Sequence, residues 1–366
     1  MRTIGKRTAL LAAAALMMMA CDQEPPTSPN RLDLDPQSHR GRGDRCSEYV
    51  INDLGVPSGF TMSYAHAINN RGQIAGNGEK DEFGAGDDEI LRAHIWWRGT
   101  TNELGTLGGM NSAAGDINDR GHVVGGSYLP GEDWQTSHAF LWRHGEMIDL
   151  GTLGGPTSSA SSINNRGIVV GYSHLASGKG HAYRWYRGKM EDLGTLGGDN
   201  SSAYAINDRG EIVGSSQTAS GESHAFLWSR GEMKDLGTLG GWSRAVDINN
   251  RGSVVGVSAT SSGGETRAFL WKRGEMIELG SLGGISSGAW AINERGEIVG
   301  NSRPPSGGYR AVLWRNGELI DLGGLGGSSL ATDINNRGDI VGFSNLPPSN
   351  FTHAVVWTCA PGHNRR

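Results

Sequence analysis

Histidine and tryptophan recur at a fixed spacing in two nearly identical segments. Residues 137–155 read SHAFLWRHGEMIDLGTLGG, and residues 223–241 read SHAFLWSRGEMKDLGTLGG. A histidine with an acid further along the segment could form a metal site or an acid–base pair. The aligned positions in all copies hold Arg92, His138, His181, His224, Arg267, Arg310 and His353. Because arginine neither ligates a metal nor acts as a base near neutral pH, we expect these side chains to donate hydrogen bonds to a loop carbonyl or an acidic neighbour.

Residues that depart from the repeat are better candidates for a site, because one site needs side chains that most copies lack. The aromatic departures are Trp134, Trp242, Trp290 and Tyr204. Such rings could stack on sugars or anchor a peptide, and local packing is the alternative for each. No Cys pair has zinc-ligand spacing, and the Gly-Gly pairs lack the lysine and helix of a phosphate loop. We therefore expect no cofactor.

An acidic insertion in the first copy is the one candidate for a metal. It contains Asp81, Asp87 and Asp88, whose carboxylates could hold calcium. The insertion lacks the D-x-[DN]-x-[DN]-G pattern of a calcium loop, so a solvated loop is favoured and no metal site is predicted.

Seven copies of an Ile-Asn pair, each followed by one residue and then Arg-Gly, set the period of the chain. The asparagines are Asn69, Asn118, Asn164, Asn207, Asn249, Asn293 and Asn335, spaced 42 to 49 residues apart. This is the period of a four-stranded propeller blade. The copy that starts at Ala160 divides into the strand candidates ASSIN, IVVGYS, HAYRW and KMEDLG, with no helix between them. The sequence predicts an all-β, seven-bladed β-propeller.

The connections between these strands differ in length. Asn-x-Arg-Gly suits a type I turn with Gly in the left-handed region, and the constant spacing from Trp to the acid predicts a tight hairpin. The loop before the Trp strand varies in length, and the Gly-rich LGTLGG passage leads to the next blade. Variable loops and passages should therefore share the face opposite the Asn-x-Arg-Gly turns. The seven repeated Trp residues are best explained as inter-blade packing.

Two further charged positions repeat in every copy. The turn arginines are Arg71, Arg120, Arg166, Arg209, Arg251, Arg295 and Arg337, and the acids before Leu-Gly are Asp53, Glu103, Asp149, Asp192, Asp235, Glu278 and Asp321. We expect these equal numbers of opposite charges to form inter-blade ion pairs or solvated turns rather than an anion-binding ring.

The first strand should close the ring. Residues 48–55, EYVINDLG, precede the first Ile-Asn strand, and the last copy stops after Trp357 without its own outer strand. Exchange of the N-terminal strand into the last blade would complete the 28 strands and bring Cys46 and Cys359 together as a disulfide. The propeller should span residues 46–359, followed by a tail at 360–366.

The N-terminus predicts export. Residues 1–20 carry Arg2, Lys6 and Arg7 before an apolar run at 9–20 that is too short to span a bilayer. The sequence LMMMAC, ending at Cys21, resembles a bacterial lipoprotein signal with Cys21 lipidated, and an ordinary signal peptide cleaved near Ala20 is the alternative. Residues 21–45 are polar and contain proline, so we expect a flexible tether.

The motifs together resemble a known family. The His-Ala-Phe tripeptides at His138 and His224, the DLGTLGG run and the INxRGxIVG run are similar to the bacterial HAF family of extracellular repeats, over residues 48–358. The resemblance implies export and a propeller-like repeat fold, and it implies no defined reaction.

The functional expectation follows from these features. The net charge of -5 and the absence of a run of five cations exclude a typical nucleic-acid partner. We expect a monomer at the bacterial cell envelope, attached to a membrane only by its lipid, whose variable-loop face binds a protein or glycan without catalysis. The alternative is an enzyme acting on a polysaccharide or ester, with acids from the first insertion and His66 near the channel. A purely structural envelope protein is a third possibility.

Overall fold

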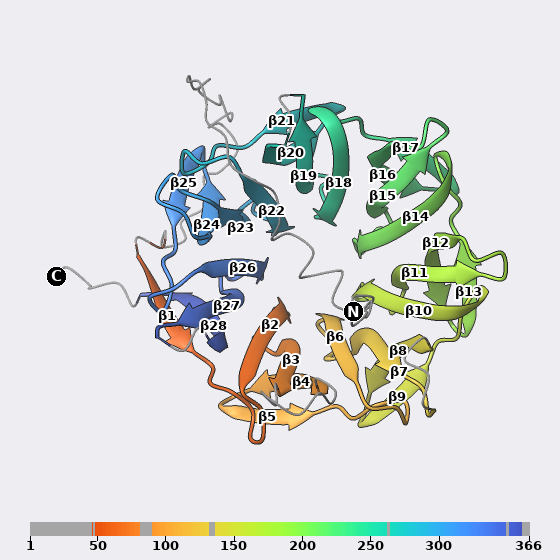
Figure 1. Cartoon of the computed structure of the whole chain (residues 1–366), viewed down its shortest axis with the longest axis horizontal. Coiled ribbons are helices and arrows are strands. Elements are labelled where there is room, and N and C mark those ends of the chain that lie inside the picture. The colour runs from red at the N-terminus through yellow and green to blue at the C-terminus, as the bar shows by residue number, and fades with distance from the viewer. Residues whose placement is uncertain are drawn as a thin grey trace, which may run out of the picture. The chain divides into compact units, whose positions relative to one another are not determined.

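The structure is a ring of seven antiparallel sheets around a central channel (Figure 1). This computed structural model describes residues 46, 48–80, 90–131, 136–261, 264–348 and 351–360. Within these residues there are 28 strands, four in each sheet, and no helix. The predicted seven-bladed all-β propeller is therefore confirmed.

Each blade contributes four short strands, as expected for propellers. Blades one and two contain β2 (Met62–Ile68), β3 (Ile74–Lys80), β4 (Ile90–Trp97), β5 (Thr100–Glu103), β6 (Ser112–Ile117), β7 (Val123–Tyr128), β8 (Ser137–Arg143) and β9 (Glu146–Asp149). Blades three and four contain β10 (Gly154–Ile163), β11 (Val169–Leu175), β12 (Gly180–Tyr186), β13 (Lys189–Asp192), β14 (Gly197–Ile206), β15 (Ile212–Thr218), β16 (Ser223–Ser229) and β17 (Glu232–Asp235). Blades five and six contain β18 (Gly240–Ile248), β19 (Val254–Thr260), β20 (Thr266–Lys272), β21 (Glu275–Glu278), β22 (Ser287–Ile292), β23 (Ile298–Ser302), β24 (Arg310–Arg315) and β25 (Glu318–Asp321). Blade seven contains β26 (Ser329–Ile334), β27 (Ile340–Leu346), β28 (Phe351–Cys359) and β1 (Tyr49–Asp53).

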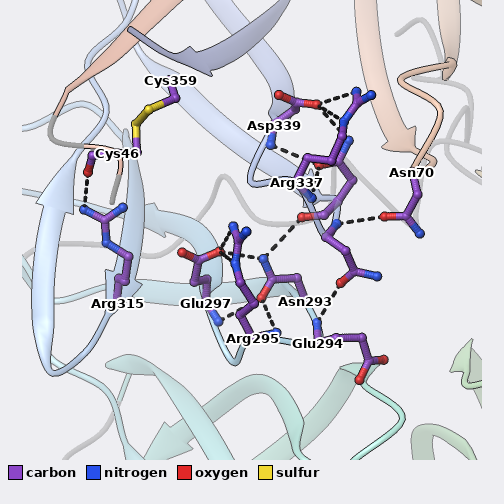
Figure 2. A network of polar contacts seen from close by, with 12 residues as sticks. Cys46, Asn70, Asn293, Glu294, Arg295, Glu297, Arg315, Arg337, Asp339 and Cys359 are labelled. Carbon is purple, nitrogen blue, oxygen red and sulfur yellow. Dashed lines mark hydrogen bonds and ion pairs between the residues drawn. A yellow bond between two sulfur atoms is a disulfide. The ribbon is translucent and has the colours of Figure 1, made fainter. Parts of the chain in front are cut away.

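The chain closes the ring by strand exchange. β1 pairs antiparallel with β28, so that Tyr49 lies opposite Cys359 and Asp53 lies opposite Val355. A disulfide joins Cys46 to Cys359, with a Cα–Cα distance of 5.4 Å (Figure 2). Both the predicted closure and the predicted disulfide are confirmed.

Two families of tight turns lie at the same end of the strands, the first in all seven sheets and the second in the six sheets whose outer strands are joined by a hairpin. In the first family, Gly72 has φ 82° and its N–H donates to the Asn69 carbonyl oxygen at 3.0 Å. In the second, Arg98 and Gly99 have φ 50° and 77°, the two positive values of a type I′ hairpin. We call the end that carries both families the turn face. The variable loops and the Gly-rich passages lie at the other end of the strands, which we call the loop face.

The core lies between blades rather than within one sheet. Val170, Ala182 and Leu193 of blade three pack against Phe226 and Trp228 of blade four. Equivalent clusters recur around the ring, and Trp357 of the last blade is fully buried. The repeated tryptophans are therefore inter-blade packing residues, as predicted.

The glycine of each Val-Gly strand lies opposite a bulge in the inner strand, where there is no room for a side chain. The register of β10 against β11 shifts between Ala160 and Ser162. A Cβ on Gly171 would lie 2.0 Å from the Ser159 carbonyl oxygen, so any larger residue there would force the two strands apart.

Candidate binding site at the central channel

The repeated His and Arg side chains form ion pairs inside their own blades. His138 Nδ1 lies 2.8 Å from Asp149, and Arg92 Nε lies 3.2 Å from Glu103. The remaining pairs are His181–Asp192, His224–Asp235, Arg267–Glu278, Arg310–Asp321 and His353–Asp53. The predicted donor role, toward an acidic neighbour, is confirmed in all seven blades.

The same pairs correct one expectation. The acids before Leu-Gly do not form inter-blade ion pairs with the turn arginines, because the register of the outer strand sets each acid diagonally across from the third-strand His or Arg of the same sheet. The turn arginines are instead exposed, as the alternative of solvated turns stated.

The turn-face end of the channel is encircled by two rings of hydrogen bonds. The Asn69 side-chain amide donates to the Asn118 carbonyl oxygen at 3.0 Å, and this bond repeats from each blade to the next. In the second ring, the Asn70 N–H donates to Asp119 Oδ1 at 2.8 Å, again with a copy in every blade. A cavity of about 170 Å³ lies within these rings. Since the ring amides and carboxylates are already hydrogen-bonded to the neighbouring blades, we interpret them as structural groups that join the blades.

Three carboxylates line the channel that the sequence reading did not single out. Asp116, Asp247 and Asp333 stand before Ile-Asn on the inner strands β6, β18 and β26. Each accepts the N–H of an isoleucine in the next blade; Asp333 Oδ2, for example, accepts from Ile68 at 2.7 Å. The signal was present as an Asp-Ile-Asn triplet in three of the seven copies.

Burial makes these carboxylates hard to ionise. Desolvation raises the pKa of Asp333 to about 8 and the pKa of Asp247 to about 6, and it raises the pKa of Asp116 as well. The negative charges of Asp116 and Asp247 raise the pKa of Asp333 further, while hydrogen bonds from backbone N–H groups oppose the shift. The raised pKa values oppose the simultaneous ionisation of all three carboxylates.

His66 also lines the channel, on β2. Its Nε2 lies 2.9 Å from the Asn77 side-chain amide nitrogen, and Asn77 Oδ1 in turn accepts the Ala114 N–H of blade two. Desolvation lowers the pKa of His66 to about 4, so the ring is neutral near pH 7. Its ring stacks on Tyr64 at a centroid distance of 6.4 Å. Within the described part of the chain, the hydrogen-bond partner of His66 is an amide rather than a carboxylate.

Three of the four predicted aromatic residues lie on adjacent inner strands. Tyr204 is on β14, Trp242 on β18 and Trp290 on β22, so blades four to six bring them to one side of the channel (Figure 1). Tyr204 and Trp290 are half-buried, whereas 38% of Trp242 is exposed at the loop-face end of its strand. Met110 occupies the corresponding position in blade two and is 46% exposed.

The half-buried aromatics have specific partners. The Arg244 guanidinium lies over the Tyr204 ring at 5.3 Å, and Trp290 Nε1 donates to Asn301 Oδ1 at 2.6 Å. These contacts hold the rings in place, which favours packing for Tyr204 and Trp290. Trp242 is the member of the group that presents its indole to solvent. Trp134, the acidic residues Asp81, Asp87 and Asp88, and Cys21 lie outside the described residues.

One segment has the spacing of a catalytic motif but not the structure that the motif requires. Residues 284–288 read Gly-Ile-Ser-Ser-Gly, the spacing of a nucleophile elbow. An elbow needs a strand-to-helix turn, but these residues lead into the inner strand β22. The central serine of the motif is Ser286, whose carbonyl oxygen accepts the Arg303 N–H at 2.9 Å, so its backbone is paired with the neighbouring strand region rather than set in an elbow. The next residue, Ser287, accepts the Ala268 N–H on Oγ at 3.0 Å, as the equivalent serine does in other blades. These residues therefore do not form a nucleophile elbow. Ser287 belongs to the set of inner-strand serines that accept a backbone N–H from the preceding blade.

Across the residues that the structure describes, no group of three His, Cys, Asp or Glu side chains is arranged to hold a metal ion. That part of the chain also contains no helix with the length and apolarity of a membrane span.

Comparison with solved structures agrees on the fold. The β-propeller domain of the Trilobed protease from Pyrococcus furiosus is similar with a TM-score of 0.56 at 10% identity, over 83% of this chain and 100% of that one. A puromycin-hydrolyzing peptidase from Mycobacterium tuberculosis is similar with a TM-score of 0.55 at 13% identity, over 84% of this chain. The match spans 54% of the peptidase's length, so it concerns about half of that protein. The sequence matches no protein-family model and no curated protein.

The Pyrococcus domain is described as having an open velcro topology. This chain differs at that point, because β1 pairs with β28 and the disulfide joins the two ends of the ring. At these identities the likeness establishes a propeller and carries no activity with it.

Proposed function

We propose that the protein is a non-catalytic recognition propeller, held outside the cytoplasm by a lipid on Cys21, whose loop face binds a protein or glycan. The observation that carries the proposal is the indole of Trp242, which is 38% exposed at the loop-face end of β18, the inner strand of blade five. An exposed indole suits both sugar stacking and peptide anchoring.

The repeated polar residues support this assignment because their side chains are already engaged in contacts that hold the ring together. The third-strand His and Arg side chains are paired with acids, the inner-strand serines bridge blades, and the turn asparagines form a closed ring. What differs between blades is gathered on the inner strands and in the variable loops. A binding site built from such differences leaves the ring itself unchanged.

The test is a screen of glycan arrays and envelope extracts with the full-length chain, followed by Trp242→Ala. We expect the variant to lose at least tenfold in affinity for any ligand found, because a Trp at the centre of an interface commonly contributes about 2 kcal/mol to the binding free energy. Tyr186→Ala is a matched control, since Tyr186 is 39% exposed but lies beside the turn face. Equal losses in both variants, or none in Trp242→Ala, would refute the loop-face assignment.

The enzyme alternative depends on His66. A neutral imidazole at the channel wall could accept a proton, but its Nε2 is engaged by Asn77. Turnover of an envelope polysaccharide or ester that disappears in His66→Ala and persists in Trp242→Ala would favour the enzyme over the binding protein.

A further inference from the structure

The charges on the turn face are distributed unevenly. In the hairpin turns of blades one to three the cations are Arg71, Arg98, Arg120, Arg143, Arg166, Arg187 and Lys189, all of them exposed. The acids of the same turns are Asp119 and Glu146. We call this part of the turn face the basic sector.

The other four blades balance their charges. The cations of their hairpin turns are Arg209, Arg230, Arg251, Lys272, Arg273, Arg295, Arg315 and Arg337. The acids are Asp208, Glu211, Glu232, Glu275, Glu294, Glu297, Glu318 and Asp339. A protein with a net charge of -5 therefore concentrates positive charge on one side of one face.

The residue after the turn glycine produces much of this difference. In blades four, six and seven it is an acid that pairs with the turn arginine, as in Arg209–Glu211 at 3.4 Å. Figure 2 shows the same arrangement for Arg295 with Glu297 and for Arg337 with Asp339. In blades one to three the position holds Gln73, His122 and Ile168, and among the described residues no carboxylate forms an ion pair with Arg71, Arg120 or Arg166.

Aromatic rings accompany the unpaired cations. The Arg98 guanidinium lies over the Trp97 ring at 4.9 Å, and the Arg187 guanidinium lies over the exposed Tyr186 ring at 5.1 Å. Trp and Tyr with adjacent cations are typical of the interface between a bilayer and water. The turns here are tight hairpins, and a pocket of about 280 Å³ lies between Gly72, Trp97 and Arg98. The cations are spread over three blades beyond this pocket, so a broad surface is the better fit.

The point where the chain enters the propeller agrees with this orientation. The Arg315 guanidinium, at a turn-face hairpin, donates to the Cys46 carbonyl oxygen at 2.8 Å (Figure 2). Residues that precede Cys46, including Cys21, therefore connect to the ring at the turn face. The tether expected at residues 21–45 would therefore leave the ring from the turn face, which allows this face to meet the membrane.

We infer that the turn face is a membrane-docking surface, on which the basic sector binds the anionic headgroups of a phospholipid bilayer. The loop face is then directed away from the membrane and remains free for the ligand of the proposed function. The contact depends on Arg and Lys charges near the lipid surface and weakens as salt screens them. Only the orientation argument rests on the proposed lipid anchor; the charge distribution stands without it.

The test measures binding of the full chain carrying Cys21→Ser, which removes the acyl anchor, to vesicles of phosphatidylglycerol and phosphatidylcholine. We expect sedimentation with vesicles rich in phosphatidylglycerol, none with pure phosphatidylcholine, and release by salt. The variant Arg71→Gln, Arg120→Gln, Arg166→Gln should bind roughly 100-fold more weakly, at about fivefold for each arginine near an anionic surface. The control Arg209→Gln, Arg295→Gln, Arg337→Gln removes the same number of cations from equivalent turns and should bind nearly as well as the parent.

Three results would overturn the inference. They are no binding by the Cys21→Ser chain at low salt, equal losses in both triple variants, and tighter binding to a soluble anionic polysaccharide than to vesicles. Circular dichroism of each variant separates lost binding from lost folding. A failure here leaves the loop-face ligand screen unaffected, because that screen uses Trp242 and not the turn arginines.

Discussion

The side-chain amide of Asn335, in the last blade, donates a hydrogen bond of 3.2 Å to the carbonyl oxygen of Asn69, in the first. This contact spans the point where the chain begins and ends, and it completes a circle of seven equivalent bonds. The side-chain oxygen Oδ1 of Asn69 accepts two backbone N–H groups of its own turn, from Arg71 and Gln73. One residue type thus shapes each turn and also joins it to the next.

Replacement of a ring asparagine should therefore cost more than a single hydrogen bond. Asn164 is 4% exposed; it donates to Asn207 and accepts from Arg166 and Ile168. We expect Asn164→Ala to lower the free energy of unfolding by about 3 kcal/mol, because it leaves buried backbone groups unpaired. Urea denaturation measures this. Asn164→Asp keeps the acceptor and should lose less, and a loss under 1 kcal/mol in the Ala variant would contradict the ring's role.

The third-strand ion pairs predict an unusual pattern of tolerance. His138→Arg should leave the free energy of unfolding within about 0.5 kcal/mol of the parent, since Arg92 makes the same contact with Glu103 at 3.2 Å. His138→Ala removes the donor to Asp149 and should cost about 1 kcal/mol. Thermal melts of both variants provide the measurement, and any ligand binding should be unchanged in both. Loss of binding with His138→Arg would indicate a chemical role for the imidazole.

Reduction of the disulfide should destabilise the whole ring. The bond joins residues 313 positions apart, and closing so long a loop contributes on the order of 5 kcal/mol in the chain-entropy model. We expect dithiothreitol, or Cys46→Ser with Cys359→Ser, to lower the melting temperature by several degrees. The double variant should be insensitive to reductant. An unchanged melting temperature in the reduced parent would show that β1 and the inter-blade contacts suffice.

The channel carboxylates make stability depend on pH in a defined direction. The pKa of Asp333 is raised to about 8 in the folded state, above the roughly 3.9 of an unfolded Asp. The proton on Asp333 is therefore bound more tightly when the protein is folded. Its contribution to the free energy of unfolding is complete below about pH 4 and is lost as the pH rises through about 8. Asp333→Asn does not titrate. The difference in unfolding free energy between parent and variant, from denaturant melts, should shift in the variant's favour between pH 5 and pH 9; a constant difference would contradict the raised pKa.

The sequence predicted the architecture because its signals are local and repeated. Asn-x-Arg-Gly encodes one turn, the constant Trp-to-acid spacing encodes one hairpin, and seven repeats of both leave few alternatives to a propeller. The unpaired ends at residues 48–55 and Trp357 indicated how the ring closes, and the pairing of β1 with β28 agrees.

Contacts between blades were harder to anticipate. That Asn69 bonds its own turn follows from local geometry, but its bond to the Asn118 carbonyl depends on how closely adjacent blades approach. The acids were assigned to the wrong partners for a related reason: counting charges suggested the turn arginines, whereas the diagonal neighbour across the outer strand pair is the His or Arg of β8 and its equivalents. The carboxylates of Asp116, Asp247 and Asp333 went unnoticed because a departure shared by three copies resembles ordinary variation.

The bond between Cys46 and Cys359 also determines how the molecule responds to tension. The segment before Cys46 joins the ring beside the outermost strand, β1, which is paired with β28 through backbone hydrogen bonds and the exposed side-chain contact between Asp53 and His353. A pull applied through that segment would peel such a strand away one residue at a time. With the covalent bond placed at the point of entry, the load passes directly to β28, which lies between two strands, and the blade is stretched along its length instead of being unzipped from its edge.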